Sequence, residues 1–188
     1  MNDQQPAFNT TCLSEKSHGD YIHRDYAAHF FRWSFANRFC PKKKVLDAGC
    51  GSDIPLPRLL SAGQGGYIPS LYVGVDYGPI KRKFNATWCH LFENTDFIAK
   101  QPEIIAQFGG FDVATSFEVI EHVPIDMRIP YLHALRASIY QGGYLLISTP
   151  VFNGKAAKNH SGPEGIREMT IPQLQELLEM SGFKVVAR

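Results

Sequence analysis

The stretch Val45-Leu46-Asp47-Ala48-Gly49-Cys50-Gly51-Ser52-Asp53 decides the fold. An apolar run ends in an acid, and two glycines two residues apart follow at the point where a strand gives way to a turn. Glycine at such a turn lets the backbone adopt a positive φ or approach a ligand closely. Ligands of open α/β sheets bind at the carboxyl ends of the strands, so we expect a binding site here. The Asp47 carboxylate would repel a pyrophosphate, which favours a cationic group or a ligand amine instead.

Three more apolar segments follow in the order typical of a doubly wound sheet. Residues 71–75 are rich in β-formers and lead into Asp76 and a Gly78-Pro79 turn. Residues 110–116 and 142–150 have the composition of a fourth and a fifth strand. Because segments with helical spacing alternate with these strands, the chain is predicted to form an α/β domain with a mostly parallel sheet.

The run VLDAGCG at residues 45–51 strongly resembles the first motif of class I S-adenosylmethionine-dependent methyltransferases, and the later segments extend this resemblance over residues 20–188. It implies a Rossmann-like domain that binds S-adenosylmethionine. In that family the acid at the position of Asp76 accepts hydrogen bonds from both ribose hydroxyls. The acid at the position of Asp96 faces the adenine amino group, and an apolar side chain, here Phe97, lies against the adenine face. The other cofactor contacts that we expect from the resemblance are Asp47, Gly49, Gly51, Tyr77 and Ser116.

A further candidate lies before the first predicted strand. The segment His29-Phe30-Phe31-Arg32-Trp33 resembles the H-x-x-R-Y element of many of these enzymes, in which the arginine meets the methionine carboxylate of the cofactor. The alternative is a surface arginine whose stem packs over Trp33. A nicotinamide dehydrogenase is disfavoured, because Ser52-Asp53-Ile54 follows Gly51 where the full G-x-G-x-x-G spacing would need another glycine.

The turn after the predicted fourth strand carries the candidate catalytic residues. Residues 117–124 closely resemble the E-V-I-E-H-V segment of the ubiquinone-biosynthesis O-methyltransferases and their relatives. Glu118, Glu121 and His122 are spaced i, i+3 and i+4, so on a helical turn they lie on one face. One interpretation is structural, with the acids bonded to backbone amides. A second makes Glu118 or His122 the general base for a hydroxyl proton, a role worth about 10²–10⁴-fold in rate.

A third interpretation is a divalent metal site. The small-RNA 3′-terminal 2′-O-methyltransferases have a similar E-x-x-E-H segment that is joined by a later histidine. The corresponding ligands here would be Glu118, Glu121, His122 and His160. Carboxylates with imidazole would suit Mg²⁺ or Mn²⁺.

The methyl acceptor is predicted partly by what this turn lacks. It has neither the D/N-P-P-Y/F segment of amino-methyltransferases acting on nucleic-acid bases nor the Pro-Cys of cytosine C5 enzymes. We therefore expect O-methylation of a small or sugar-like acceptor. One alternative is a metal-assisted 2′-O-methyltransferase of an RNA end. Another is a non-catalytic S-adenosylmethionine-binding subunit that partners a second protein.

Composition agrees with these expectations. The chain has 188 residues, of which 44% are hydrophobic, enough for one domain with a sizeable core. Its net charge of +1 gives no overall attraction to nucleic acid or to an anionic membrane. The four cysteines show no C-x-x-C pattern, which favours a reducing, cytoplasmic compartment. No signal peptide or membrane helix is expected.

The predicted organisation is a flexible lead over residues 1–19 and a single domain over residues 20–188. We expect a covering helix over 20–39, helices over 102–108 and 129–140, the last ended by Gly142-Gly143, and another from Thr170 to Gly182. Residues 183–187 are predicted to form a sixth strand, and the antiparallel seventh strand of the family is missing. An open sheet edge is usually covered, so we expect either that the natural chain continues past Arg188 or that a neighbouring molecule masks this edge.

Overall fold

The structure is a computed structural model that describes residues 24–53, 56–57, 68–81, 84–151 and 168–186. Its helices are α1 (Arg24–Ala36), α3 (Phe97–Phe108), the short 3₁₀ helix η1 (Ile125–Met127), α4 (Arg128–Ser138) and α5 (Ile171–Met180). Its strands are β1 (Lys44–Ala48), β2 (Leu71–Val75), β3 (Cys89–Phe92), β4 (Phe111–Phe117) and β5 (Ile139–Ser148). The expected lead over residues 1–19 lies outside the described residues.

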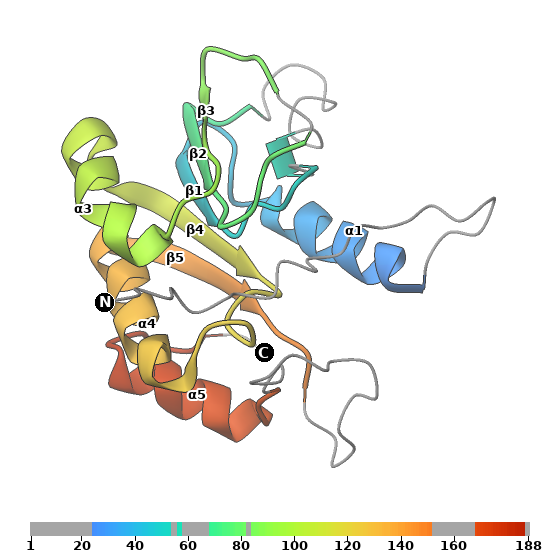
Figure 1. Cartoon of the computed structure of the whole chain (residues 1–188), viewed down its shortest axis with the longest axis vertical. Helices are drawn as coiled ribbons and strands as arrows, with labels where there is room; N and C mark the ends of the chain where they lie inside the picture. The colour runs from blue at the N-terminus through green and yellow to red at the C-terminus, as the bar shows by residue number, and fades with distance from the viewer. Residues whose placement is uncertain (1–23, 54–55, 58–67, 82–83, 152–167, 187–188) are drawn as a thin grey trace, which may run out of the picture.

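The five strands form one sheet in the order β3-β2-β1-β4-β5, and every neighbouring pair is parallel. The direction of winding reverses between β1 and β4, which places the topological switch point at their carboxyl ends. Both candidate regions follow these two strands, since the glycine loop comes after β1 and the turn with Glu118 comes after β4. The predicted α/β doubly wound architecture is therefore confirmed (Figure 1).

Alternation along the strands divides the core between the two faces of the sheet. Leu46 of β1 belongs to the larger cluster, which packs under α3, α4 and α5. Its neighbour Val45 belongs to a second cluster with Ala36 of α1 and Tyr72 of β2. Figure 1 shows the same arrangement, with α1 apart from the other three helices.

Several boundaries differ from the sequence predictions. Helix α1 ends at Ala36, three residues before the expected end at residue 39. Helix α3 begins five residues before the expected position, because the Asp96 side chain caps it by accepting from the backbone N–H groups of Ile98 and Ala99. Pro102 consequently lies inside the helix rather than in its first turn. Helix α4 ends at Ser138, so Gly142 and Gly143 lie within β5 and do not end the helix.

The predicted sixth strand is wrong for the residues that the structure describes. Residues 183–186 alternate between partly buried and exposed side chains, as a strand would, but they have no strand partner there. Phe183 and Val185 pack against the core instead. The predicted helix from Thr170 is confirmed, and a capping box with Gln173 fixes its start.

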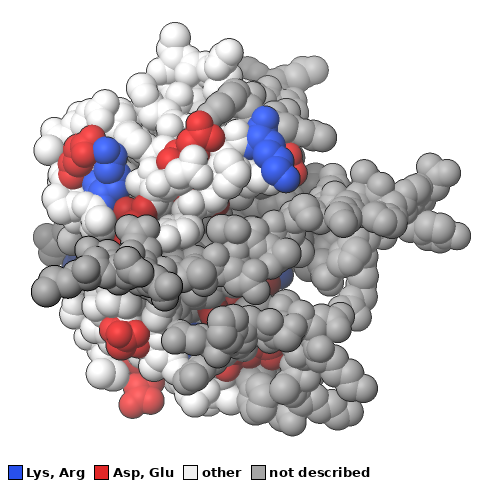
Figure 2. All heavy atoms as spheres, in the orientation of Figure 1, with Lys and Arg blue, Asp and Glu red and all other residues white. Residues whose placement is uncertain are grey.

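Figure 2 shows one face of the molecule, on which acidic groups of the described residues are more widespread than basic ones. Within the described ranges, every helix is too short or too polar to cross a membrane.

Candidate active site

The glycine loop after β1 has the geometry that its sequence predicts. Gly49 and Gly51 both have positive φ, +88° and +75°. The backbone N–H groups of Gly49 and Cys50 donate to the Val75 carbonyl oxygen at 2.8 and 3.1 Å, which holds the loop against the end of β2. A Cβ on Gly49 would collide with the Val119 side chain, whereas a Cβ on Gly51 would meet nothing within 4 Å among the described residues. Gly49 thus allows two segments to pack together, and Gly51 faces open space.

Asp76 joins this loop to the end of β2. Its Oδ2 accepts from the Gly51 N–H at 2.8 Å, and its Oδ1 accepts from the Gly78 N–H at 2.8 Å. Burial raises the pKa of this carboxyl, while the two hydrogen bonds oppose the rise. Each carboxylate oxygen can accept a second hydrogen bond, so the arrangement fits the predicted ribose contact.

Asp47 points into the protein rather than toward open space. It is 5% exposed, and it accepts hydrogen bonds from the Tyr72 hydroxyl at 2.6 Å and the Thr115 hydroxyl at 2.7 Å. Burial raises the pKa of its carboxyl to about 6. The expected direct contact with a ligand amine is therefore not supported by this geometry. The side chain instead links β1 to its neighbours β2 and β4 through these two hydrogen bonds.

Three of the other expected cofactor contacts lie in different surroundings. Ser116 is fully buried and shares a 2.8 Å hydrogen bond with Tyr131. Phe97 is 8% exposed, and its ring packs edge-on against Tyr131 with 5.8 Å between centroids. The structure places both side chains in the core rather than on an open ligand surface. Tyr77, by contrast, is exposed directly after Asp76.

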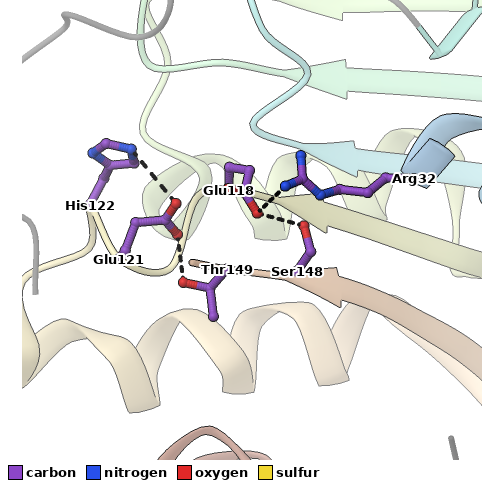
Figure 3. A network of polar contacts seen from close by, with 6 residues as sticks. All are labelled: Arg32, Glu118, Glu121, His122, Ser148 and Thr149. Atoms are coloured by element: carbon purple, nitrogen blue, oxygen red, sulfur yellow. Dashed lines mark hydrogen bonds and ion pairs between the residues drawn. The ribbon is translucent and has the colours of Figure 1, made fainter. Parts of the chain in front are cut away.

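The turn after β4 begins with a strained residue. Glu118 has φ +58°, a left-handed conformation that costs a non-glycine residue about 1–3 kcal/mol and is often found at functional sites. Its Oε1 accepts from the Ser148 hydroxyl at 2.9 Å and lies 3.3 Å from Nη2 of Arg32, as Figure 3 shows. The arginine that the sequence assigned to the cofactor carboxylate is therefore paired with a carboxylate of this turn.

Glu121 and His122 continue this network (Figure 3). Glu121 is 4% exposed and accepts from the Thr149 hydroxyl at 3.0 Å. Burial, with the nearby Glu118 charge as a smaller cause, raises the pKa of its carboxyl to about 7. Nε2 of His122 lies 4.0 Å from Glu121 Oε1, and the imidazole side chain is 31% exposed. The buried Glu121 carboxyl group thus lies next to the partly exposed His122 imidazole.

The predicted metal site receives no support from this geometry. Within the described part of the chain, His, Cys, Asp and Glu side chains nowhere form a group of three that could hold a metal ion. The fourth expected ligand, His160, lies outside the described residues.

Sequence reasoning missed the hydroxyl partners of the two acids. Ser148 is the last residue of β5 and Thr149 follows it, and parallel neighbours bring their carboxyl ends to the same edge of a sheet. If the fourth and fifth predicted strands had been taken as neighbours, the hydroxyls of Ser148 and Thr149 would have been expected beside Glu118 and Glu121.

Comparison with known proteins agrees with this arrangement. Residues 21–188 match a family described as a methyltransferase domain. The chain belongs to this family. The match confirms the resemblance to class I S-adenosylmethionine-dependent methyltransferases that the glycine motif carries.

Two curated relatives and one solved structure illustrate the range of the family. The chain is 27% identical, over 77% of its length, to a tRNA U34 carboxymethyltransferase of Ectopseudomonas mendocina. It is 30% identical, over 66% of its length, to a ubiquinone biosynthesis O-methyltransferase of Aromatoleum aromaticum. It spans about half of each relative, 46% and 51%. A methyltransferase of Archaeoglobus fulgidus described as SAM-dependent shares the fold, with a TM-score of 0.58, 19% identity and coverage of 84% of this chain and 67% of that one.

Proposed function

We propose that this protein transfers a methyl group from S-adenosylmethionine to a hydroxyl oxygen of a small or sugar-like acceptor. The observation that carries the proposal is the packing of the glycine loop on the turn after β4. Gly49 approaches Val119 so closely that no side chain fits between them. A donor bound on the loop would therefore lie beside Glu118, Glu121 and His122.

The donor side fits the proposed cofactor. No described residue would obstruct a side chain at Gly51, which lies beside the Asp76 carboxylate, and the oxygens of this carboxylate can still accept from a ribose. Tyr77, Asp96 and the backbone of the loop complete the proposed contacts. When bound, S-adenosylmethionine supplies an activated methyl group on a sulfonium and leaves as S-adenosylhomocysteine. Holding the acceptor in line with that methyl group supplies most of the rate.

On the acceptor side, we propose that His122 is the general base that takes the hydroxyl proton of the acceptor. Its imidazole is partly exposed, whereas Glu118 is engaged by Arg32 and Ser148 and Glu121 is buried. A nitrogen of His122 would accept the hydroxyl proton as the oxygen forms its bond to the methyl carbon. Glu121, close behind the ring, would stabilise the resulting imidazolium. Glu118 would hold the turn in its strained conformation through Arg32 and Ser148.

A small acceptor is favoured over RNA for two reasons. Several relatives are described as ubiquinone biosynthesis O-methyltransferases, and the face in Figure 2 has no accumulation of basic groups among the described residues. The tRNA relative keeps an RNA acceptor as the alternative to be tested. The free thiols of Cys40, Cys50 and Cys89 support a cytoplasmic setting for the reaction.

The experiment is a measurement of S-adenosylhomocysteine release with acceptor pools of phenols, sugars and RNA, each with Mn²⁺ and with a chelator. We expect turnover with a hydroxylated small molecule that persists under chelation and falls at least a hundredfold in His122→Asn. Turnover with RNA alone, lost under chelation and restored by Mn²⁺, would instead identify the metal-assisted alternative. Cofactor binding without turnover on any pool would favour a non-catalytic partner subunit.

A further inference from the structure

Strand β5 contains an unusually large bulge near its start. Phe111 of β4 pairs with Ile139, but two residues later Val113 pairs with Tyr144. Asp112 therefore stands opposite four residues of β5, Tyr140 to Gly143. Gly142 has φ +83°, and a Cβ on Gly143 would lie 2.6 Å from the Asp112 carbonyl oxygen, so glycine is required for this path. Bulges of this kind redirect side chains and are often found next to binding sites.

The bulge opens a cavity of about 320 Å³ at the amino end of the sheet. This volume is at the lower end of the range for small-molecule sites, roughly 300–1,000 Å³. Its lining includes Arg38, Phe39, Lys43, Asp112, Tyr140 and Tyr144. Because the glycine loop is at the carboxyl end of the same sheet, this cavity is separate from the proposed active site.

The cavity has an excess of positive charge. Lys43 Nζ lies 3.8 Å from Asp112 Oδ1, and Asp112 Oδ2 accepts from the Lys44 N–H at 2.8 Å. The single carboxylate is therefore already engaged. The Arg38 side chain is exposed and makes no hydrogen bond or ion pair with any residue that the structure describes. Since Lys43 is paired with Asp112, the excess positive charge comes from the Arg38 guanidinium, and an anion entering the cavity would meet it first, with the Lys43 ammonium group as a second, weaker donor.

The cavity also presents aromatic rings. Tyr140 and Tyr144 are 47% and 50% exposed, and Tyr144 packs against Phe39 with 5.6 Å between ring centroids. Tyr140 lies over Gly110, where a Cβ would be 2.6 Å from its ring. Exposed rings that are supported from behind are suitable platforms for a planar ligand.

We propose that this cavity binds a planar aromatic anion, with the ring on Tyr140 and Tyr144 and the anionic group on Arg38 and Lys43. Two kinds of molecule share this chemistry, a nucleoside monophosphate and an aromatic carboxylate. The inference does not depend on methyl transfer, since none of these residues belongs to the proposed active site.

The test is calorimetric titration of the full chain with AMP, benzoate and uncharged adenosine. Saturating S-adenosylhomocysteine is present throughout, so that the cofactor site is filled. We expect AMP or benzoate to bind, with the stronger of the two identifying the source, and adenosine to bind at least about tenfold more weakly than AMP. Arg38→Gln should weaken anion binding by roughly tenfold, because it removes a charged donor. Tyr144→Ala should weaken it as well.

Arg136→Gln is the matched control, since Arg136 is an exposed arginine of α4 on the other face of the sheet. It should leave the titrations unchanged. Normal binding of S-adenosylhomocysteine by Arg38→Gln establishes that this variant is folded. Absence of heat with both anions, or equal anion affinity in wild type and Arg38→Gln, would overturn the proposal.

Discussion

The two halves of the candidate active site are built in different ways. The glycine loop is held mainly by backbone groups, with Gly49 and Cys50 donating to Val75 and Gly51 donating to Asp76. The turn after β4 is held by side chains that come from α1, from β5 and from the residue after β5. Backbone geometry tolerates few substitutions, whereas a side-chain network can lose one member and keep its shape. We therefore expect the largest effects at the loop.

Gly49→Ala should have the largest effect. The new methyl group would overlap Val119, and alanine at φ +88° adds backbone strain. Together these should lower the free energy of unfolding by about 2–4 kcal/mol and abolish binding of S-adenosylhomocysteine. Denaturant unfolding and calorimetry measure the two quantities.

Gly51→Ala is the matched control, because φ is similar there but a Cβ meets none of the described residues within 4 Å. It should cost about 1–2 kcal/mol from backbone strain alone. Adding Val119→Ala to Gly49→Ala should recover part of the lost stability. Equal losses in the two alanine variants would show that contact between the loop and the turn is not what requires Gly49.

Glu121→Gln should change how stability depends on pH. In the folded protein the pKa of Glu121 is raised from 4.5 to about 7, so the folded state binds this proton more tightly than the unfolded state. Wild type should therefore lose stability as the pH rises from about 4.5 to 7, by at most about 1.4 kcal/mol per pH unit. The variant should lack this part of the decline.

Asp47, with a pKa raised to about 6, adds a similar decline to both proteins. The informative quantity is therefore the difference between wild type and Glu121→Gln in urea unfolding at pH 5 and at pH 8. A difference that stays constant with pH would mean that Glu121 does not titrate in this window.

Ser148→Ala should have a smaller effect, confined to the turn. It removes the hydrogen bond to Glu118, at a cost of about 1 kcal/mol, while Arg32 continues to hold the carboxylate. Combining it with Arg32→Gln should lower stability or turnover by more than the sum of the two single changes. Simple additivity in this double-mutant cycle would mean that the network is not cooperative.

Asp96→Ala should have an effect on the fold as small as that of Ser148→Ala. It removes the cap of α3, which costs about 1 kcal/mol. 5′-Deoxy-5′-methylthioinosine lacks the adenine amino group and serves as the comparison ligand. If Asp96 contacts that amino group, Asp96→Ala should reduce the affinity for S-adenosylhomocysteine several-fold more than it reduces the affinity for this ligand. An affinity equal to that of wild type would leave Asp96 with the capping role alone.

The same contrast explains what the sequence could predict. Neighbouring residues encode the positive φ of Gly49, the strand before it and the acid that follows β2. The fold and the loop could therefore be predicted from the local sequence pattern. The partners of Glu118 and Asp47 are 25 to 86 residues away in the chain, and no local signal specifies them. The prediction of a sixth strand was wrong for a related reason. Alternation of apolar and polar residues predicts an extended segment, but it does not specify a partner strand.

The most direct test compares Asp76→Ala with His122→Asn in one pair of assays. Asp76→Ala should weaken S-adenosylhomocysteine binding at least about tenfold, since it removes the charge-assisted hydrogen bonds that we propose Asp76 makes to the ribose. His122→Asn should bind S-adenosylhomocysteine as wild type does, yet its turnover of the acceptor should be lower by about a hundredfold or more. Unchanged cofactor affinity in Asp76→Ala, or full turnover in His122→Asn, would contradict the division into a donor side and an acceptor side.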